Sequence, residues 1–139
     1  MPITYSMSTA GVDWAELKRA LVADHFDNER TPEQYRLSHE NSHAVIFVRD
    51  GDGFVGNGRI LSDGVCNAYL IDIWTRTDHR RRGIGSEIVR RLCATVPGQH
   101  VGLFTDDMQR FYAALDFRIR PDFMDKVIGR WLDNDTAEL

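Results

Sequence analysis

The chain has 139 residues, of which 42% are hydrophobic and 27% are charged, and its net charge is −4. This length suits one compact domain over residues 1–139, with a frayed polar tail at 133–139. The composition excludes a disordered, collagenous or coiled-coil chain. We expect no membrane-spanning helix and no secretory signal. Cys66 and Cys93 form no CxxC pair, which predicts two reduced thiols in a cytoplasmic protein.

The positive charge is concentrated in one segment. Residues 76–91 contain six arginines against Asp78 and Glu87, a local net charge of +4, so the rest of the chain carries −8. An acidic protein with one cationic segment suits a small anionic ligand better than a long polyanion. We therefore expect no nucleic-acid binding.

A strand and two helices are the first predicted elements. Ile3–Ser6 has the composition of a short strand. Asp13 stands three residues before Glu16, as a helix-capping residue does. Thr31-Pro32-Glu33-Gln34 combines a capping box with proline at the first helical position, which predicts a second helix.

Three antiparallel strands are predicted next. They cover Ala44–Val48, Phe54–Leu61 and Asn67–Thr75, and Gly-Asp turns separate them. A helix follows, because Ile84, Ile88 and Leu92 recur at helical spacing. Strands followed by a helix in this way indicate an α/β chain.

The last predicted elements are a short strand, a helix and two closing strands. They cover His100–Phe104, Met108–Leu115, Phe117–Arg120 and Lys126–Leu132. The predicted order is β-α-α-β-β-β-α-β-α-β-β. The fold class is a single mixed, mostly antiparallel central sheet flanked by helices.

The segment that carries chemistry follows the longest strand. Arg80-Arg81-Arg82-Gly83-Ile84-Gly85 leads directly into a helix. The first amides of a helix lack intrahelical partners and carry partial positive charge, so they attract anions. Glycines allow a phosphate oxygen close to the backbone, and arginines donate to phosphate. A diphosphate-bearing ligand fits this pattern.

Two common diphosphate motifs are absent. The dinucleotide motif GxGxxG fails because Ile88 stands where its third glycine belongs. A P-loop requires Gly-Lys-Ser/Thr after a longer loop, which the sequence lacks. The spacing that remains is Arg80-x-x-Gly83-x-Gly85.

This segment resembles the R/Q-x-x-G-x-G/A signature of the GNAT N-acyltransferase superfamily. The strand Ile71–Thr75 and the later segment Phe111-Tyr112-Ala113-Ala114-Leu115-Asp116-Phe117 are similar to two further family segments. Thr75 and Asp116 depart from the family pattern, which has valine and glycine there, and Thr105 stands at a customary asparagine. The resemblance covers about Ala44 to Arg120.

The resemblance implies acetyl-coenzyme A as acyl donor and co-substrate, and no metal. Backbone groups of Ile73, Trp74 and Thr75 would pair with the pantetheine arm. The pyrophosphate would bind the residues of the arginine–glycine segment, namely Arg80, Arg81, Arg82, Gly83, Ile84, Gly85 and Ser86. The expected reaction is direct attack of a primary amine, from a small molecule or a peptide, on the thioester in a ternary complex.

Two residues are the catalytic candidates. In the family, a tyrosine at the place of Tyr112 protonates the departing thiolate, although Tyr112 also fits a core position. Asp72 is the carboxylate inside the central strand, and burial there would raise its pKa and favour a general base. Strand alternation points Asp72 away from the face of Ile71 and Ile73, unless a bulge intervenes. A structural role remains open, and Tyr69 and Asp63 are weaker rivals.

Other residues give weaker signals. His39 and His43 have i, i+4 spacing but no third metal ligand beside them. Acceptor-pocket walls and ordinary core positions are equal alternatives for four residues, namely Phe26, Trp74, Phe123 and Met124. A non-catalytic acyl-coenzyme-A-binding regulatory module is the alternative function, and assembly as a homodimer is left open.

Overall fold

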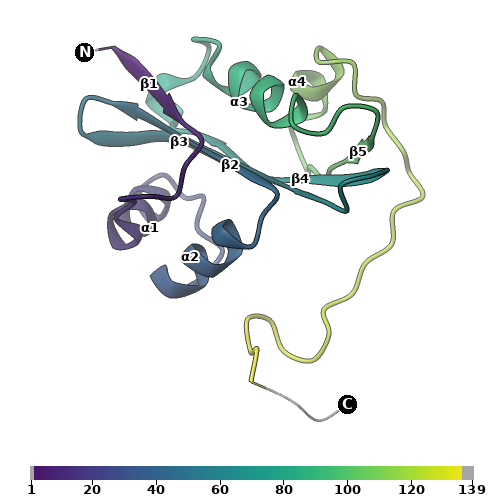
Figure 1. Ribbon diagram of the computed structural model, residues 1–139, viewed down its shortest axis with the longest axis horizontal. Coiled ribbons are helices and arrows are strands. Elements are labelled where there is room, and N and C mark those ends of the chain that lie inside the picture. The colour runs from purple at the N-terminus through teal and green to yellow at the C-terminus, as the bar shows by residue number, and fades with distance from the viewer. Residues whose placement is uncertain (1, 136–139) are drawn as a thin grey trace. The chain divides into compact units, whose positions relative to one another are not determined.

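The computed structural model describes residues 2–135, which divide into two compact units. The first ends at Phe104 and the second begins at Thr105. The first unit holds the sheet and helices α1 to α3, whereas the second holds α4 (Gln109–Ala113; Figure 1). The single domain over 1–139 stays a prediction. Most of the predicted frayed tail, residues 136–139, lies outside the described residues.

A five-stranded sheet forms the centre of the first unit. Its strands lie side by side in chain order: β1 (Ile3–Ser6), β2 (Ala44–Asp50), β3 (Gly53–Ser62), β4 (Asn67–Thr75) and β5 (His100–Gly102). Successive pairs from β1 to β4 are antiparallel, and β5 runs parallel to β4. The predicted mixed, mostly antiparallel sheet is therefore confirmed.

Helices cover both faces of this sheet. α1 (Trp14–Ala23) and α2 (Pro32–Glu40) lie on one face, and α3 (Ile84–Cys93) lies on the other (Figure 1). The predicted caps are present. Glu16 donates its backbone N–H to Asp13 at 3.0 Å, and Thr31 and Gln34 form a reciprocal capping box. These local hydrogen bonds satisfy orphan amides and fix where both helices begin.

The core between the sheet and helices α1 and α2 is aromatic-rich. Seven buried side chains form it: Leu17, Leu21, Tyr35, Val45, Phe47, Phe54 and Trp74. On the opposite face, Gly56 and Gly58 of β3 lie directly under α3. A Cβ at Gly58 would stand 2.9 Å from Ile88 Cγ2, and one at Gly56 would stand 3.1 Å from Ile88 Cδ1. Glycine at these two positions therefore lets α3 approach the sheet.

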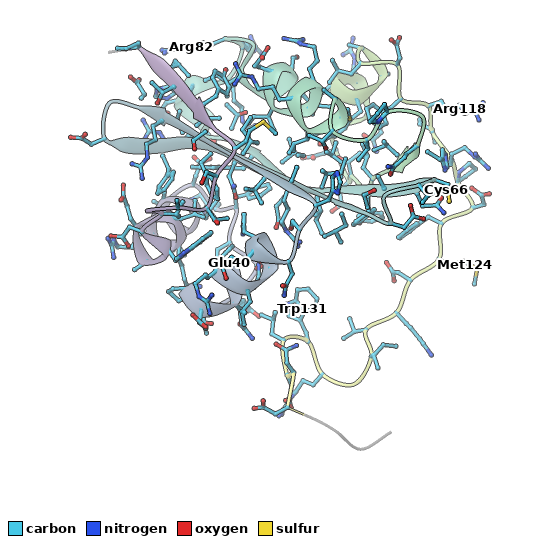
Figure 2. The ribbon with its side chains drawn as sticks, viewed as in Figure 1. Glu40, Cys66, Arg82, Arg118, Met124 and Trp131 are labelled. Atoms are coloured by element: carbon cyan, nitrogen blue, oxygen red, sulfur yellow. The ribbon has the colours of Figure 1, made fainter. Side chains whose placement is uncertain are left out.

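The two predicted closing strands are wrong for the described residues. Phe117–Arg120 and Lys126–Leu132 contain no strand, and Ile119 and Met124 are 75% and 92% exposed. The side chains of Met124 and Trp131 project from an extended ribbon (Figure 2). The apolar residues of these two segments favour burial, but a strand forms only when a neighbouring strand pairs with its backbone.

No helix within residues 2–135 is long and apolar enough to cross a membrane. Cys66 and Cys93 are free cysteines. The hydrogen bond to Asp63 raises the pKa of the exposed Cys66 thiol, and burial raises that of Cys93. Both thiols are therefore held in the less reactive protonated form.

Candidate active site

A β-bulge interrupts β4 at its centre. Asn57 pairs with Trp74 and Arg59 pairs with Ile71, so Asp72 and Ile73 together oppose one residue of β3. Asp72 adopts a φ of +61°, a left-handed conformation that aspartate tolerates better than most residues. The bulge that would interrupt the strand alternation at Asp72 is thus present.

The far half of β4 is an open edge within the first unit. β5 pairs with β4 only through Asn67–Tyr69, and the register of the described sheet includes no strand beyond Tyr69 on that side. Ile73, Trp74 and Thr75 lie in this half. Such an edge can accept an extended ligand as an added strand.

Asp72 and Ile73 point to opposite faces of the sheet. Ile73 reaches toward α3, where its Cδ1 would stand 2.9 Å from a Cβ at Gly58. Asp72 faces the other side and accepts hydrogen bonds from Arg30 Nη2 at 2.8 Å and Arg59 Nε at 2.7 Å. All three charged side chains are at most 14% exposed. The bulge therefore presents a carboxylate that two buried guanidinium groups already hold.

The expected rise in the pKa of Asp72 is wrong. Burial alone would raise that pKa, but the charges and hydrogen bonds of Arg30 and Arg59 outweigh it, and the pKa is lowered. The sequence reasoning considered burial without these two partners. An ionised carboxylate with a lowered pKa is a weak proton acceptor, so a catalytic role for Asp72 stays a prediction.

The arginine–glycine segment forms a loop at the start of α3. The 3₁₀ turn η1 (Thr77–His79) precedes it, and Arg81 and Gly83 have φ angles of +66° and +79°. Gly83 is the N-cap residue of α3 and provides no side-chain cap. Glu87 N–H is the first to bond back, to Gly83 O at 3.1 Å. The amides before it are left for an anion.

The charge on this loop faces outward. Arg80, Arg81 and Arg82 are exposed, and Arg82 lies at the periphery of the first unit (Figure 2). No ion pair joins Arg81 or Arg82 to an acid within residues 2–135. We call residues 80–86 the phosphate loop, because free helix amides and unpaired guanidinium groups are what a phosphate group binds.

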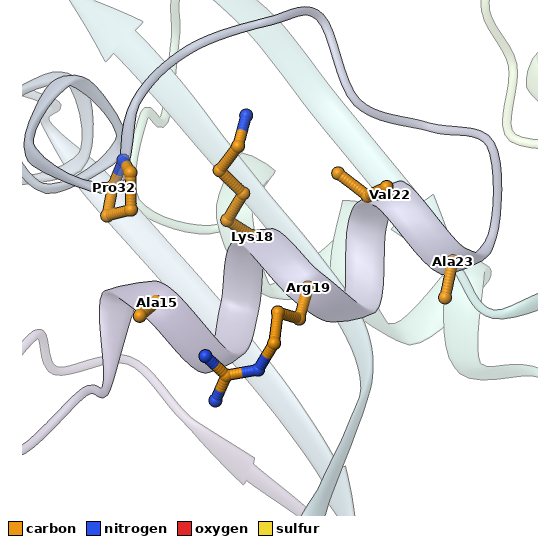
Figure 3. Close-up of a pocket in the computed structure, with 6 residues that line it drawn as sticks. All are labelled: Ala15, Lys18, Arg19, Val22, Ala23 and Pro32. Atoms are coloured by element: carbon orange, nitrogen blue, oxygen red, sulfur yellow. The ribbon is translucent and has the colours of Figure 1, made fainter.

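Two open pockets lie elsewhere in the first unit. The larger, about 430 Å³, is on α1 around Lys18 and Arg19 and reaches Pro32 at the start of α2 (Figure 3). The other, about 350 Å³, is lined by Asp24 and Arg76 among others. Neither includes the phosphate loop, of which residues 80–83 are exposed.

Tyr112 lies on α4 in the second unit. Its ring contacts Phe111 and Phe117 edge-on, with centroids 4.9 and 5.7 Å away. Burial raises its pKa to about 12, so its hydroxyl stays protonated at neutral pH. The role of Tyr112 as proton donor stays a prediction.

Asp116 explains how α4 ends without the glycine of the family pattern. Its φ is +71°, its N–H donates to Ala113 O at 3.0 Å, and Phe117 N–H donates to Tyr112 O at 3.1 Å. These two bonds and the Phe117–Tyr112 contact form a Schellman motif. Aspartate therefore takes the left-handed position that glycine usually fills.

The weaker candidates have structural roles. Asp63 accepts N–H bonds from Val65, Cys66 and Asn67, which lower its pKa strongly and fix the turn before β4. His39 is buried, and burial lowers its pKa. Residues 2–135 contain no cluster suited to a metal ion.

Of the four pocket-wall candidates, only Trp74 is core. It is 1% exposed and donates Nε1–H to Asp24 Oδ2 at 2.9 Å. Phe26, Phe123 and Met124 are at least 40% exposed. Trp74 can therefore offer a ligand its backbone but not its side chain.

Comparison with known families decides the class of protein. The profile described as the acetyltransferase (GNAT) family matches residues 14–117, which is most of the chain and includes the bulge and the phosphate loop. The chain belongs to the GNAT acetyltransferase family. A search of curated proteins found no match for this GNAT chain.

Solved structures share the fold of this GNAT chain. A Deinococcus radiodurans R1 protein assigned to the acetyltransferases is 26% identical, with a TM-score of 0.77 and coverage of 89% of this chain and 87% of that one. A GNAT family acetyltransferase from Streptococcus pneumoniae TIGR4 is 21% identical, with a TM-score of 0.75 and coverage of 94% and 99%. General acetyl transfer is therefore the activity of the family to which the fold belongs.

Sequence reasoning missed three charged residues beside the candidate site. Arg30 and Arg59 hold Asp72, and His79 sits between two carboxylates beside the phosphate loop. None belongs to a short motif. The carboxylates that they bond are distant in the chain: 13 residues from Arg59, 29 from His79 and 42 from Arg30. Only a structure brings these charges together.

Proposed function

We propose that this protein transfers the acetyl group of acetyl-coenzyme A to a primary amine of a small molecule or peptide. The observation that carries the proposal is the phosphate loop at the uncapped start of α3, next in sequence to the open half of β4. A diphosphate and an extended amide-containing arm require these two features side by side along one chain.

The residues fit such a co-substrate. Backbone groups of Ile73, Trp74 and Thr75 would hold the pantetheine arm. The pyrophosphate would bind residues 80–86, where a Cβ at Gly83 meets open space and the start of α3 has no side-chain cap. When bound, acetyl-coenzyme A supplies an activated thioester. Backbone N–H groups near the bulge would polarise its carbonyl.

Proton handling is assigned to Tyr112 and to water. Tyr112 keeps its phenolic proton at neutral pH and would donate it to the leaving thiolate. Asp72 was the candidate for base, but it is ionised and paired with Arg30 and Arg59. We therefore assign Asp72 first to holding the bulge, and water becomes the simplest acceptor for the proton of the amine.

The fold leaves the acceptor open. A ribosomal-protein-alanine N-acetyltransferase from Brucella melitensis and a glucosamine-6-phosphate N-acetyltransferase from Arabidopsis thaliana share it, at 14% and 12% identity and TM-scores of 0.62 and 0.67. One acts on a protein and the other on a sugar phosphate, as their names state. The same sheet and helices thus serve both acceptor classes. A cytoplasmic location and a homodimer remain expectations.

Two measurements test the proposal. Calorimetry with coenzyme A tests binding, and release of free thiol from acetyl-coenzyme A across a panel of peptide and small-molecule amines tests transfer. We expect both binding and acceptor-dependent thiol release. Binding without thiol release for any amine would favour the regulatory module. Absence of binding would overturn the assignment of the phosphate loop.

A further inference from the structure

His79 is enclosed by carboxylates immediately before the phosphate loop. It is 6% exposed and ends η1. Its Nε2 lies 2.7 Å from Oδ2 of Asp50, at the end of β2, and its Nδ1 lies 2.7 Å from Oδ1 of Asp78. The imidazole thus joins the segment leading into α3 to the hairpin formed by β2 and β3.

Both neighbours of the ring are acceptors. The hydrogen bond with His79 lowers the pKa of Asp50 despite the opposing effect of burial. Hydrogen bonds from Arg76 and His79 lower the pKa of Asp78 to about 2. An ionised carboxylate offers lone pairs, which an imidazole N–H can meet. A carboxylate therefore faces each ring nitrogen of His79.

We infer that His79 is a positioning residue that fastens the phosphate loop to the β2–β3 hairpin and thereby sets its affinity for coenzyme A. The inference rests on the proposed function. Residues 80–83 are exposed and contain two positive φ angles, at Arg81 and Gly83. A loop with so few contacts of its own depends on its anchored ends to hold the conformation that binds.

The surrounding charges support a second effect of the same contact. Arg76 pairs with Asp78, and its Nη2 lies 3.4 Å from His79 Nδ1. Arg82 is close enough to Asp50 to act on its pKa. While Asp50 bonds to His79, that carboxylate competes less for Arg82. Loss of the imidazole would free Asp50 to attract a guanidinium that the phosphate needs.

Calorimetry on variants of the full chain tests the inference. We expect His79→Asn to weaken coenzyme A binding by about tenfold and to change the affinity for pantetheine, which lacks the diphosphate, by less than about twofold. His25→Asn is the matched control, because His25 is exposed on another loop and Asn tolerates its φ of +60°. Unchanged coenzyme A affinity in folded His79→Asn would overturn the inference.

A second variant and a spectroscopic measurement make the test independent of His79→Asn folding. Asp50→Ala removes one acceptor from the surface end of β2, and we expect it to weaken coenzyme A binding in the same selective way. Nitrogen–proton NMR of the free protein should show a protected imidazole N–H signal that His79→Asn removes. Absence of any protected imidazole N–H signal from His79 would overturn the inference. Failure of the wild type to bind coenzyme A would instead overturn the proposed function and leave the NMR result standing.

Discussion

Oδ2 of Asp72, on the bulge of β4, accepts a hydrogen bond from Nη2 of Arg30, 42 residues earlier in the chain, at 2.8 Å. Arg30 also donates to Ser38 Oγ, and its guanidinium lies 4.2 Å from the centroid of the Tyr35 ring. Arg59 donates to the same carboxylate oxygen at 2.7 Å. A buried charge network therefore joins the loop before α2 to the strand that would hold the acyl donor.

Asp72→Asn should lower the free energy of unfolding by about 3 kcal/mol at neutral pH, because two buried guanidinium groups lose their counter-charge. The pKa of Asp72 is lowered below its ordinary value of 3.8. Its stabilisation is therefore complete above that value and is lost as the pH falls through the folded-state pKa. Denaturant titrations from pH 7 to 2 should show the difference between variant and wild type shrinking only in acid. Asp52→Asn, in an exposed turn, is the control, and a constant difference at all pH values would contradict the prediction.

Gly85→Glu should abolish coenzyme A binding and leave the fold largely intact. Gly85 is the second residue of α3, so the new carboxylate would stand at the free amides and repel the pyrophosphate. Val65→Glu adds the same charge at a position that is 77% exposed in another turn, and should bind normally. Calorimetry on both variants, with circular dichroism to check folding, decides the matter. Normal affinity in folded Gly85→Glu would remove this turn from the site.

Arg81→Ala combined with Arg82→Ala should weaken coenzyme A binding and reduce its dependence on salt. Exposed charges are screened over about 8 Å at physiological ionic strength, so wild-type affinity should fall as salt rises. Removal of exposed Arg19 and Arg118, neither in the phosphate loop, provides a control of equal charge. Affinities measured at several salt concentrations test this. A wild-type affinity that ignores salt would mean that the arginines do not touch phosphate.

Tyr112→Phe should lower the maximal acetylation rate by about 10²-fold, the usual scale for a lost proton donor, once an acceptor is known. Acetyl-coenzyme A affinity should stay within a few fold, because the ring and its contacts with Phe111 and Phe117 remain. Steady-state kinetics and thermal denaturation separate the roles. Tyr5→Phe, on β1, should leave the rate unchanged. A near-wild-type rate for Tyr112→Phe would leave the thiolate to be protonated by solvent.

Asp116→Gly should stabilise the end of α4 by about 1 kcal/mol, since glycine adopts a positive φ without the clash that a Cβ causes. Asp125→Gly, at a position without positive φ, should not stabilise the protein. Thermal denaturation of the two variants gives the comparison. A loss of stability at Asp116→Gly would show that the aspartate side chain contributes more than the left-handed backbone costs.

Local signals in the sequence predicted much of the fold. Asp13 and Thr31 cap the helices that they were expected to cap, because a cap depends on residues three positions apart. Asn67–Thr75 is a strand with the predicted bounds. The phosphate loop was found from spacing for the same reason, since its amides and arginines are neighbours along the chain.

Relationships between distant residues could not be predicted in this way. Arg30 carries no motif that points to Asp72, so the direction of the pKa shift was missed. Apolar residues in 117–132 indicated strands, although strand formation depends on pairing with another segment. The bulge could not be predicted, because nothing in Ile71-Asp72-Ile73 requires an extra residue opposite β3.

Gly56 and Gly58 have an effect that reaches beyond the core. Because both lie against α3, any side chain there would push the helix away from β3 and move its first turn outward. The amides of that turn belong to the phosphate loop, so a substitution in the middle of the sheet would reach the proposed co-substrate site without touching it. These two interior positions would then influence acetyl-donor affinity as well as packing.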